Sequence, residues 1–233
     1  SNCEKCSQKS MTKILQGEMS ANIEELHILK PKISWSPDDK KLLISAKSKG
    51  EDVLFIIDLN NRNKKEKLIF SDNIKSIVHP TWNPVSQNWI AFIGSNAIQS
   101  DVYIFNLNSK ELINMTNDIF SDQHVNWSLD GTTLLFSSDR EGNTNNNMND
   151  FNAWGTQYDL YSIVMNDESN NNLLRLTTTA YDEIYPINFK FDNWVTFISN
   201  KNGINNIYLF DKETNITKPI TNVLTGVTQL TAI

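Results

Sequence analysis

The chain has 233 residues, of which 39% are hydrophobic and 21% are charged, a composition typical of a globular protein with a buried core. Its 21 Lys and Arg residues against 27 Asp and Glu residues give a formal net charge of −6, which argues against a nucleic-acid partner. The longest uninterrupted apolar runs, such as residues 53–57, are far shorter than the roughly 20 residues that span a membrane.

Both cysteines, Cys3 and Cys6, lie in the first six residues. One such pair supplies half of a tetrahedral zinc site, and no second Cys or His pair follows at zinc-finger spacing, so we expect no metal and no other cofactor. The pair is interpreted as part of a flexible tail or, alternatively, Cys3 is a lipid-attachment position near a removed export signal. Residues 1–30 are expected to form an N-terminal arm, in which residues 22–26 begin a short helix or residues 26–29 form an outer strand.

One sequence unit recurs from residue 31 onwards at a spacing of about 45 residues. Three copies begin around Trp35, Trp82 and Trp127, which are 47 and 45 residues apart. Each copy then has a second apolar run, a third run that opens with an aspartate, and a short closing element. The second runs are 42–45, 89–92 and 134–137, the third runs begin at Asp52, Asp101 and Asp159, and the closing elements include 114–116 and 175–177.

The fourth copy of the unit is degenerate. Residues 186–189 stand where the tryptophan segment is expected, so either Asn188 or Phe189 takes the tryptophan position. The later runs of this copy lie at 194–197, 206–209 and 219–221.

Each unit is predicted to be four short antiparallel β-strands, because its runs have four to six residues and are rich in β-branched and aromatic types. Asn and Asp tolerate left-handed backbone in turns, which explains how a chain with only 8 glycines forms so many of them. One such sheet cannot bury both faces, so neighbouring sheets must stack face to face. The predicted fold is therefore all-β, a β-propeller of about four four-stranded antiparallel blades. The expected blades are about 31–79, 80–124, 125–185 and 186–233.

The order of these motifs resembles that of TolB-like β-propeller repeats, the WD-like blades of bacterial cell envelopes. The third copy matches best, with the resemblance carried by residues 127–131 (WSLDG), 136–142 (FSSDREG), 159–161 (DLY) and 176–177 (LT). The resemblance covers about residues 31 to 233, and it departs from the pattern where Asp39 replaces a turn glycine. It implies a non-catalytic scaffold for protein–protein interaction in the periplasm or cell envelope, with envelope proteins or peptides as partners. The repeat does not specify which residues bind them.

Two further expectations concern the whole protein. Residues 221–227 lead towards another blade, so we expect the chain to be part of a larger propeller. An alternative to the scaffold is the substrate-gating propeller of a prolyl-oligopeptidase, dipeptidyl-peptidase or tricorn-like peptidase whose catalytic domain is absent from this chain; a lectin or small-ligand binder is a third reading. The sequence contains no nucleophile elbow, phosphate loop or HExxH motif, so this segment is not expected to be an enzyme.

The candidate partner face is predicted at the blade ends that carry the B–C and D–A connections, where strands A to D run outward from the axis. The D–A connections repeat an aromatic and acidic signature at 70–72, 120–122 and 181–183. A ring of these side chains would bind a cation or a basic peptide at the channel mouth. Alternatively, each aspartate caps its own turn and each histidine fills a loop. The residues of this ring are Asp72, Asp122 and Asp182, with His79, His124 and Tyr185 at equivalent positions just before strand A.

The third copy carries an insertion at residues 143–157, between its second and third strands and on the same face. Its Asn-rich beginning is typical of a solvated loop and contains no Asp-x-Asp-x-Asp-Gly calcium motif. Phe151 and Trp154 form an aromatic pair at its end. This pair predicts either a plug packed over the channel or an exposed anchor for a partner.

Overall fold

The computed structural model describes residue 14 and residues 23–26, 32–61, 64–70, 73–140, 157–165, 173–189 and 191–231. These residues form strands and turns and include no helix, so none of them belongs to a helix that could cross a membrane. Cys3, Cys6, Asp72, Phe151 and Trp154 lie outside the described residues.

Sixteen of the strands form four antiparallel sheets, each with four consecutive strands lettered A to D. Blade 1 contains β2 (Ile33–Trp35), β3 (Lys41–Ser48), β4 (Glu51–Asp58) and β5 (Lys65–Leu68). Blade 2 contains β6 (Ser76–Trp82), β7 (Trp89–Ser95), β8 (Ser100–Asn106) and β9 (Leu112–Asn114). Blade 3 contains β10 (Asp122–Trp127), β11 (Thr133–Ser138), β12 (Asp159–Val164) and β13 (Leu174–Arg175). Blade 4 contains β14 (Glu183–Phe189), β15 (Phe191–Ser199), β16 (Asn206–Asp211) and β17 (Ile216–Pro219).

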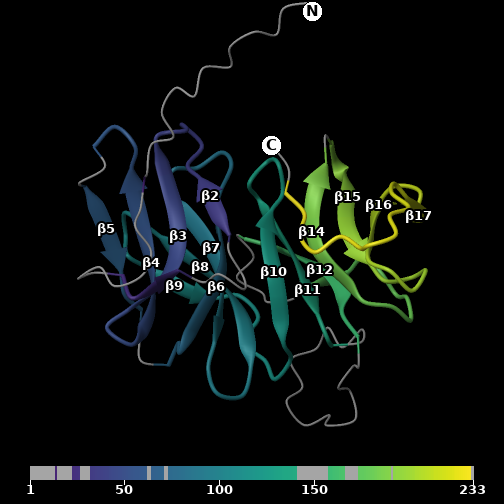
Figure 1. Ribbon diagram of the computed structural model, residues 1–233, viewed down its shortest axis with the longest axis horizontal. Helices are drawn as coiled ribbons and strands as arrows, with labels where there is room; N and C mark the ends of the chain where they lie inside the picture. The colour runs from purple at the N-terminus through teal and green to yellow at the C-terminus, as the bar shows by residue number, and fades with distance from the viewer. Residues whose placement is uncertain are drawn as a thin grey trace, which may run out of the picture.

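The four blades lie side by side with their A strands towards the middle of the molecule, so the predicted all-β propeller is confirmed (Figure 1). Each blade contacts the next one, from blade 1 through blade 4. Among the described strands, those of blade 1 make no contact with those of blade 4. The described part of the chain is therefore an open arc of four blades.

The N-terminal arm contributes a short strand, β1 (Glu25–Leu26), that pairs with β3 beside the end of β2. Of the two readings of this segment, the strand is the one that the structure shows, although it begins one residue earlier than expected. Ile23 is buried against blade 1, and Ile14 packs against the same apolar cluster. The arm thus covers part of the face of blade 1 that points away from blade 2.

The inner strands of blades 2, 3 and 4 begin at Ser76, Asp122 and Glu183, ahead of the expected blade boundaries at 80, 125 and 186. In each strand the pairing register shifts at a β-bulge, between Val78 and Thr81 in the first of them. A bulge interrupts the period-two pattern of a strand, and the first half of each strand was therefore missed in the sequence.

His79, His124 and Tyr185 lie inside these bulges, rather than just before strand A as expected. Their φ angles are 53°, 55° and 56°, in the left-handed region that non-glycine residues adopt infrequently. A bulge residue in this conformation turns its side chain out of the regular alternation of the strand. The same backbone device is therefore repeated in three successive blades.

The tryptophans of blades 1 to 3 occupy one equivalent position in strand A, and blade 4 has a different residue there. Trp35, Trp82 and Trp127 face Leu42, Ile90 and Leu134 of strand B, and Asn188 occupies the same register position opposite Val195. Asn188, rather than Phe189, therefore takes the tryptophan position in blade 4.

Trp82 and Trp127 lie in the apolar layers between blades. Trp82 packs between blades 1 and 2 with residues such as Leu43 and Phe92, and Trp127 packs between blades 2 and 3 with residues such as Ile104. They are 4% and 6% exposed. Trp35 is 54% exposed, because no blade precedes blade 1 among the described residues.

The Trp-Ser-x-Asp-Gly motif fixes the turn between strands A and B. In blade 3, Ser128 Oγ donates to Asp130 Oδ1 at 2.5 Å and accepts a hydrogen bond from Thr133 N at 2.9 Å. Gly131 has a φ of +70°, and a Cβ there would lie 2.5 Å from Asn83 Oδ1 of the neighbouring blade. In blade 1 the equivalent Asp39 has a φ of 57°, so aspartate replaces glycine in the same left-handed conformation.

Replacing the inter-blade tryptophans tests this packing. We expect Trp82→Ala and Trp127→Ala each to lower the free energy of unfolding by about 3–5 kcal/mol, because each leaves a cavity between two sheets. The matched change Trp35→Ala, at the same register position but largely exposed, should cost less than about 1 kcal/mol. Urea denaturation measures all three. A cost for Trp35→Ala equal to that for Trp127→Ala would contradict the open arc.

Candidate functional site

The four A strands surround an axial cavity of about 840 Å³. The turns between strands A and B contribute Pro37, Asp39 and Pro84 to its wall, and the C-terminal segment contributes residues 229–231. Ile33, Trp35 and Trp82 also line it, and each blade adds two further side chains, one three residues before the tryptophan register position and one immediately before that position. The first set is Lys32, His79, His124 and Tyr185, and the second is Ser34, Thr81, Asn126 and Ile187.

His79, His124 and Tyr185 form a compact aromatic cluster in this cavity. The ring centroids of His79 and His124 are 4.6 Å apart, and those of His124 and Tyr185 are 3.9 Å apart. His79 and Tyr185 meet edge to face at 5.8 Å. Both histidines are buried, and the His124 backbone N–H donates to His79 Nδ1 at 3.4 Å. These three predicted site residues are therefore brought together, inside the cavity rather than around its rim.

Lys32 completes the set from blade 1 and reaches across the axis to blade 3. Its ammonium donates to the Val125 carbonyl at 2.8 Å and to Asn126 Oδ1 at 2.6 Å. Asn126 Nδ2 in turn donates to the Pro186 carbonyl of blade 4 at 2.9 Å. Burial lowers the pKa of Lys32 to about 7, since both of its partners are uncharged.

Sequence analysis missed Lys32, although its position holds a detectable signal. The residue stands three places before Trp35, as His79 and His124 stand before their tryptophans. The corresponding positions of the other blades hold histidine or tyrosine, and a lysine does not match that pattern. Positional equivalence within the repeat would have found it.

The described lining of the cavity holds three nitrogen bases and one carboxylate, a different balance from that of the chain as a whole. Lys32, His79 and His124 face it, and the carboxylate that the structure places in its wall is Asp39, at the exposed A–B turn. The net charge of the chain is −6. The acidic groups are therefore concentrated elsewhere.

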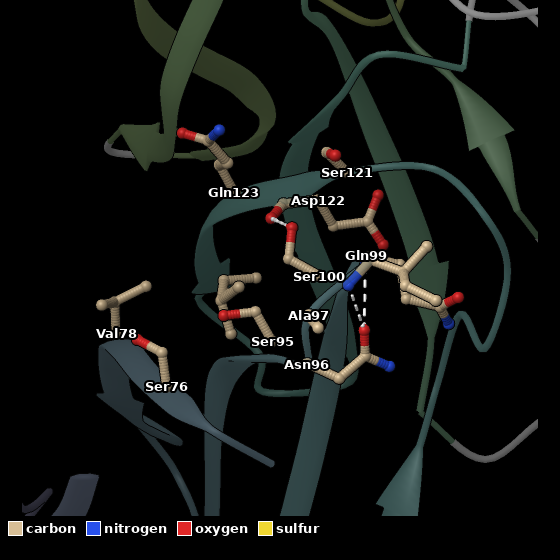
Figure 2. A pocket seen from close by; sticks show the side chains of 12 residues that line it. Ser76, Val78, Ser95, Asn96, Ala97, Gln99, Ser100, Ser121, Asp122 and Gln123 are labelled. Atoms are coloured by element: carbon tan, nitrogen blue, oxygen red, sulfur yellow. Dashed lines mark hydrogen bonds between the residues drawn. The ribbon is translucent and has the colours of Figure 1, made fainter. Parts of the chain in front are cut away.

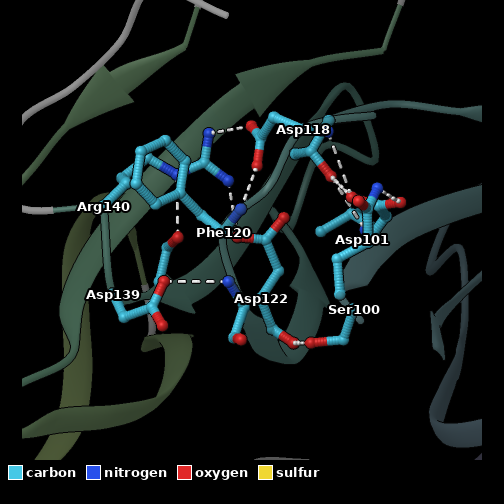
Figure 3. Close-up of polar contacts among 12 residues, drawn as sticks. Ser100, Asp101, Asp118, Phe120, Asp122, Asp139 and Arg140 are labelled. Atoms are coloured by element: carbon cyan, nitrogen blue, oxygen red, sulfur yellow. Dashed lines mark hydrogen bonds and ion pairs between the residues drawn. The ribbon is translucent and has the colours of Figure 1, made fainter. Parts of the chain in front are cut away.

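Asp122 belongs to a buried ionic cluster between blades 2 and 3, outside the axial cavity (Figure 3). Its Oδ1 accepts from Arg140 Nη2 at 2.5 Å, while Arg140 Nη1 donates to Asp118 Oδ2 at 2.7 Å and Nε donates to Ser138 Oγ. The guanidinium also lies 5.4 Å from the ring centroid of Tyr161. Burial raises the pKa of Asp118 and Asp122, and the Arg140 charge opposes that shift. The cluster holds the D–A connection against blade 3.

Asp182 also fixes a turn. Its Oδ1 accepts from the Tyr158 backbone N–H at 3.1 Å, and its backbone N–H donates to Asn200 Oδ1 at 3.1 Å. The described aspartates of the predicted ring are therefore used in structural contacts, Asp122 with Arg140 and Asp182 with the segment before strand C, whereas the histidines and Tyr185 line a cavity.

A second, smaller recess of about 250 Å³ lies at the opposite blade ends, between blades 2 and 3 (Figure 2). Uncharged polar side chains such as Ser76, Ser95 and Gln123 dominate its wall. Ser100 Oγ donates to the Asp122 carbonyl, and Asn96 Oδ1 accepts from the Gln99 backbone N–H. These contacts close the local turns, so the axial cavity remains the better candidate for a ligand.

The geometry defines the class: four stacked four-stranded blades around an axial cavity make a β-propeller protein. No protein-family model matches the chain. Over 84 residues the chain is 32% identical to the Tol-Pal system protein TolB of Ruthia magnifica subsp. Calyptogena magnifica, covering 36% of this chain and 19% of that protein. The predicted resemblance to TolB-like β-propellers is confirmed.

Solved structures agree with this fold. The putative TolB from Agrobacterium tumefaciens has a TM-score of 0.67 at 20% identity, covering 84% of this chain and 63% of that one. TolB from Acinetobacter baumannii has a TM-score of 0.64 at 19% identity, covering 85% and 44%. Peptidases and an oligogalacturonate lyase share the fold at 11–15% identity. The chain thus spans less than two thirds of the TolB proteins that it matches.

The buried Glu183, the first residue of β14, should make stability depend on pH. Burial raises its pKa from 4.5 to about 7, and Thr179 Oγ1 donates to it at 3.0 Å. The folded state therefore favours the protonated acid. The contribution of this group to the free energy of unfolding is greatest below pH 4.5 and is lost as the pH rises through 7. We expect Glu183→Gln to gain thermal stability relative to the unmodified chain between about pH 5 and pH 7.5. Calorimetry at both pH values measures the melting temperatures, with the exposed Glu213→Gln as control. The same difference between Glu183→Gln and the unmodified chain at both pH values would contradict the raised pKa.

Lys32 should have the complementary effect at alkaline pH. Its folded-state pKa of about 7 lies below the usual 10.5, so the folded protein disfavours the ammonium below pH 7 and is relieved as the pH rises towards 10.5. We therefore expect the melting temperature of the unmodified chain to rise relative to that of Lys32→Met between pH 7 and about pH 9.5. The exposed Lys40→Met is the matched control. A pH-independent difference for Lys32→Met would show that Lys32 is not desolvated.

Proposed function

We propose that this chain is a non-catalytic propeller scaffold of the bacterial cell envelope, acting in the periplasm and holding a segment of a partner protein in its axial cavity. The proposal rests on one observation above all, a cavity to which all four blades contribute side chains. A cavity of about 840 Å³ is large enough for several residues of a peptide.

The mouth of the cavity suits a protein partner. Trp35 and Ile33 are 54% and 62% exposed and line it together with Pro37 and Pro84. Exposed tryptophan beside a pocket is typical of the residues that dominate the energy of protein interfaces. Polar donors deeper in the cavity, such as Thr81 and Asn126, would orient a bound segment.

The envelope location is supported by similarity to a Tol-Pal system protein. In an envelope assembly, a scaffold without catalytic motifs would act by binding other proteins. A lipid anchor at Cys3 would be compatible with this location and forms part of the proposal.

Cross-linking from the cavity mouth tests the scaffold. A photoreactive phenylalanine analogue placed at position 35, irradiated in intact cells, should give a discrete adduct with an envelope protein. The matched control places the analogue at Ile216 on the outer strand β17, which is 49% exposed. Adducts at position 216 but not at 35, or adducts with cytosolic proteins alone, would contradict the proposal. Hydrolysis of aminoacyl amides by the full-length protein would instead favour the substrate-gating propeller of a peptidase.

A further inference from the structure

We propose that the axial cavity recognises a carboxylate on the partner segment, and that the Lys32 ammonium, with His79 and His124 beside it, is the group that holds it. This inference rests on the proposed function for the nature of the partner. Its chemistry comes from the cavity itself. The carboxylate would belong either to an acidic side chain or to the C-terminus of the segment.

The first support is the set of hydrogen bonds that Lys32 makes in the cavity. Its ammonium has three N–H groups, and two of them donate to neutral oxygens, the Val125 carbonyl and Asn126 Oδ1. The structure gives this side chain no carboxylate partner among the described residues. Lys32 is partly buried, and withdrawing an ammonium from water without an anionic partner is costly. A ligand carboxylate would supply the missing counter-charge.

The second support is the chemistry of the surrounding wall. His79 from β6 and His124 from β10 face the cavity on one side, and Tyr185 from β14 adds a phenol. Asp39, the one carboxylate that the described wall contains, lies at an exposed turn. Imidazole, ammonium and phenol groups all donate hydrogen bonds to oxyanions. The wall therefore favours an anion over the cation that the acidic signature of the sequence predicted.

The third support is positional. Lys32, His79, His124 and Tyr185 occupy the same place in four successive blades. The bulges turn the last three of these side chains out of the strand alternation, and all four line the cavity. Non-glycine residues in the left-handed region carry a conformational cost. Three such residues at one level of the axis are consistent with a site built for a ligand.

Binding should be linked to proton uptake. A carboxylate beside the ammonium favours its charged form, so the pKa of Lys32, which burial lowers to about 7, would rise in the complex. Affinity should therefore be highest below pH 7 and fall as the pH rises above it. His79, His124, Tyr185 and Asp39 also face the cavity, so variants of Lys32 are needed to separate its contribution.

The experiment uses three short synthetic peptides as probes. The first has one central glutamate and blocked ends, the second has glutamine in its place, and the third is the glutamine peptide with a free C-terminus. Binding to the full chain is followed by NMR through the imidazole signals of its three histidines, at pH 6.5 and pH 8.5. Preference for the first or the third probe over the second identifies the side-chain or the C-terminal carboxylate as the recognised group.

We expect a carboxylate probe to bind about tenfold tighter than the blocked glutamine peptide at pH 6.5, with a smaller ratio at pH 8.5. Lys32→Met should lose the preference, whereas the exposed Lys40→Met should keep it. Lys32→Arg should keep the preference at both pH values, because arginine stays charged. This arginine variant keeps the test informative if Lys32→Met fails to fold.

Equal binding of all three probes, no binding of any probe, or a preference that survives in Lys32→Met would overturn the carboxylate assignment. These results are independent of the cross-linking experiment. An envelope adduct from position 35 without a carboxylate preference would leave the scaffold proposal intact. A carboxylate preference without any envelope adduct would instead leave a ligand site and remove the scaffold.

Discussion

Every blade of this protein needs a neighbour, because a twisted sheet of four short strands has two apolar faces and cannot cover either of them alone. The clusters around Trp82 and Trp127 show how the need is met: each tryptophan extends from the innermost strand of one blade over the face of the blade before it. Stability is therefore distributed between blades rather than within them. The cavity exists because stacking of this kind places the four inner strands around a common axis.

The inner strands carry a second constraint, since they must both pair with strand B and present side chains to the axis. A regular strand alternates its side chains between two faces, and in a propeller both faces are occupied by neighbouring blades. The bulges at His79, His124 and Tyr185 resolve this conflict by inserting one left-handed residue whose side chain follows neither face. The axial wall is thus made by departures from strand geometry.

The fold could be predicted from the sequence because its signals are local and repeated. The tryptophans, the Ser-x-Asp turns and the Asp-opened third strands recur in order, and the hydrogen bonds of Ser128 and Asp130 show that those residues are selected by turn geometry. Asn188 and the early starts of β6, β10 and β14 could not be read, since a bulge changes the register without leaving a composition signal.

The site was harder to predict because its chemistry depends on which side chains meet across blades. His79, His124 and Tyr185 could be predicted from their shared position in the repeat. The direction of the Asp122 side chain could not, because it depends on an ion pair with Arg140, 18 residues away. The acidic signature predicted a ring of aspartates around the axis, and its described members, Asp122 and Asp182, are used in structural contacts instead. Lys32 acts from a blade that lacks a bulge among its described residues and so shares no visible motif with the others.

The hydrogen bonds from Lys32 to Asn126 and from Asn126 to Pro186 have a mechanical consequence. They join blade 1, blade 3 and blade 4 across the hollow of an arc whose end blades share no strand contacts among the described residues. A ligand that draws the ammonium away from Asn126 breaks the first of these hydrogen bonds and leaves the packing between blades unchanged. The curvature of the arc would then depend on packing between blades alone. Binding in the cavity would therefore change the distance between blade 1 and blade 4.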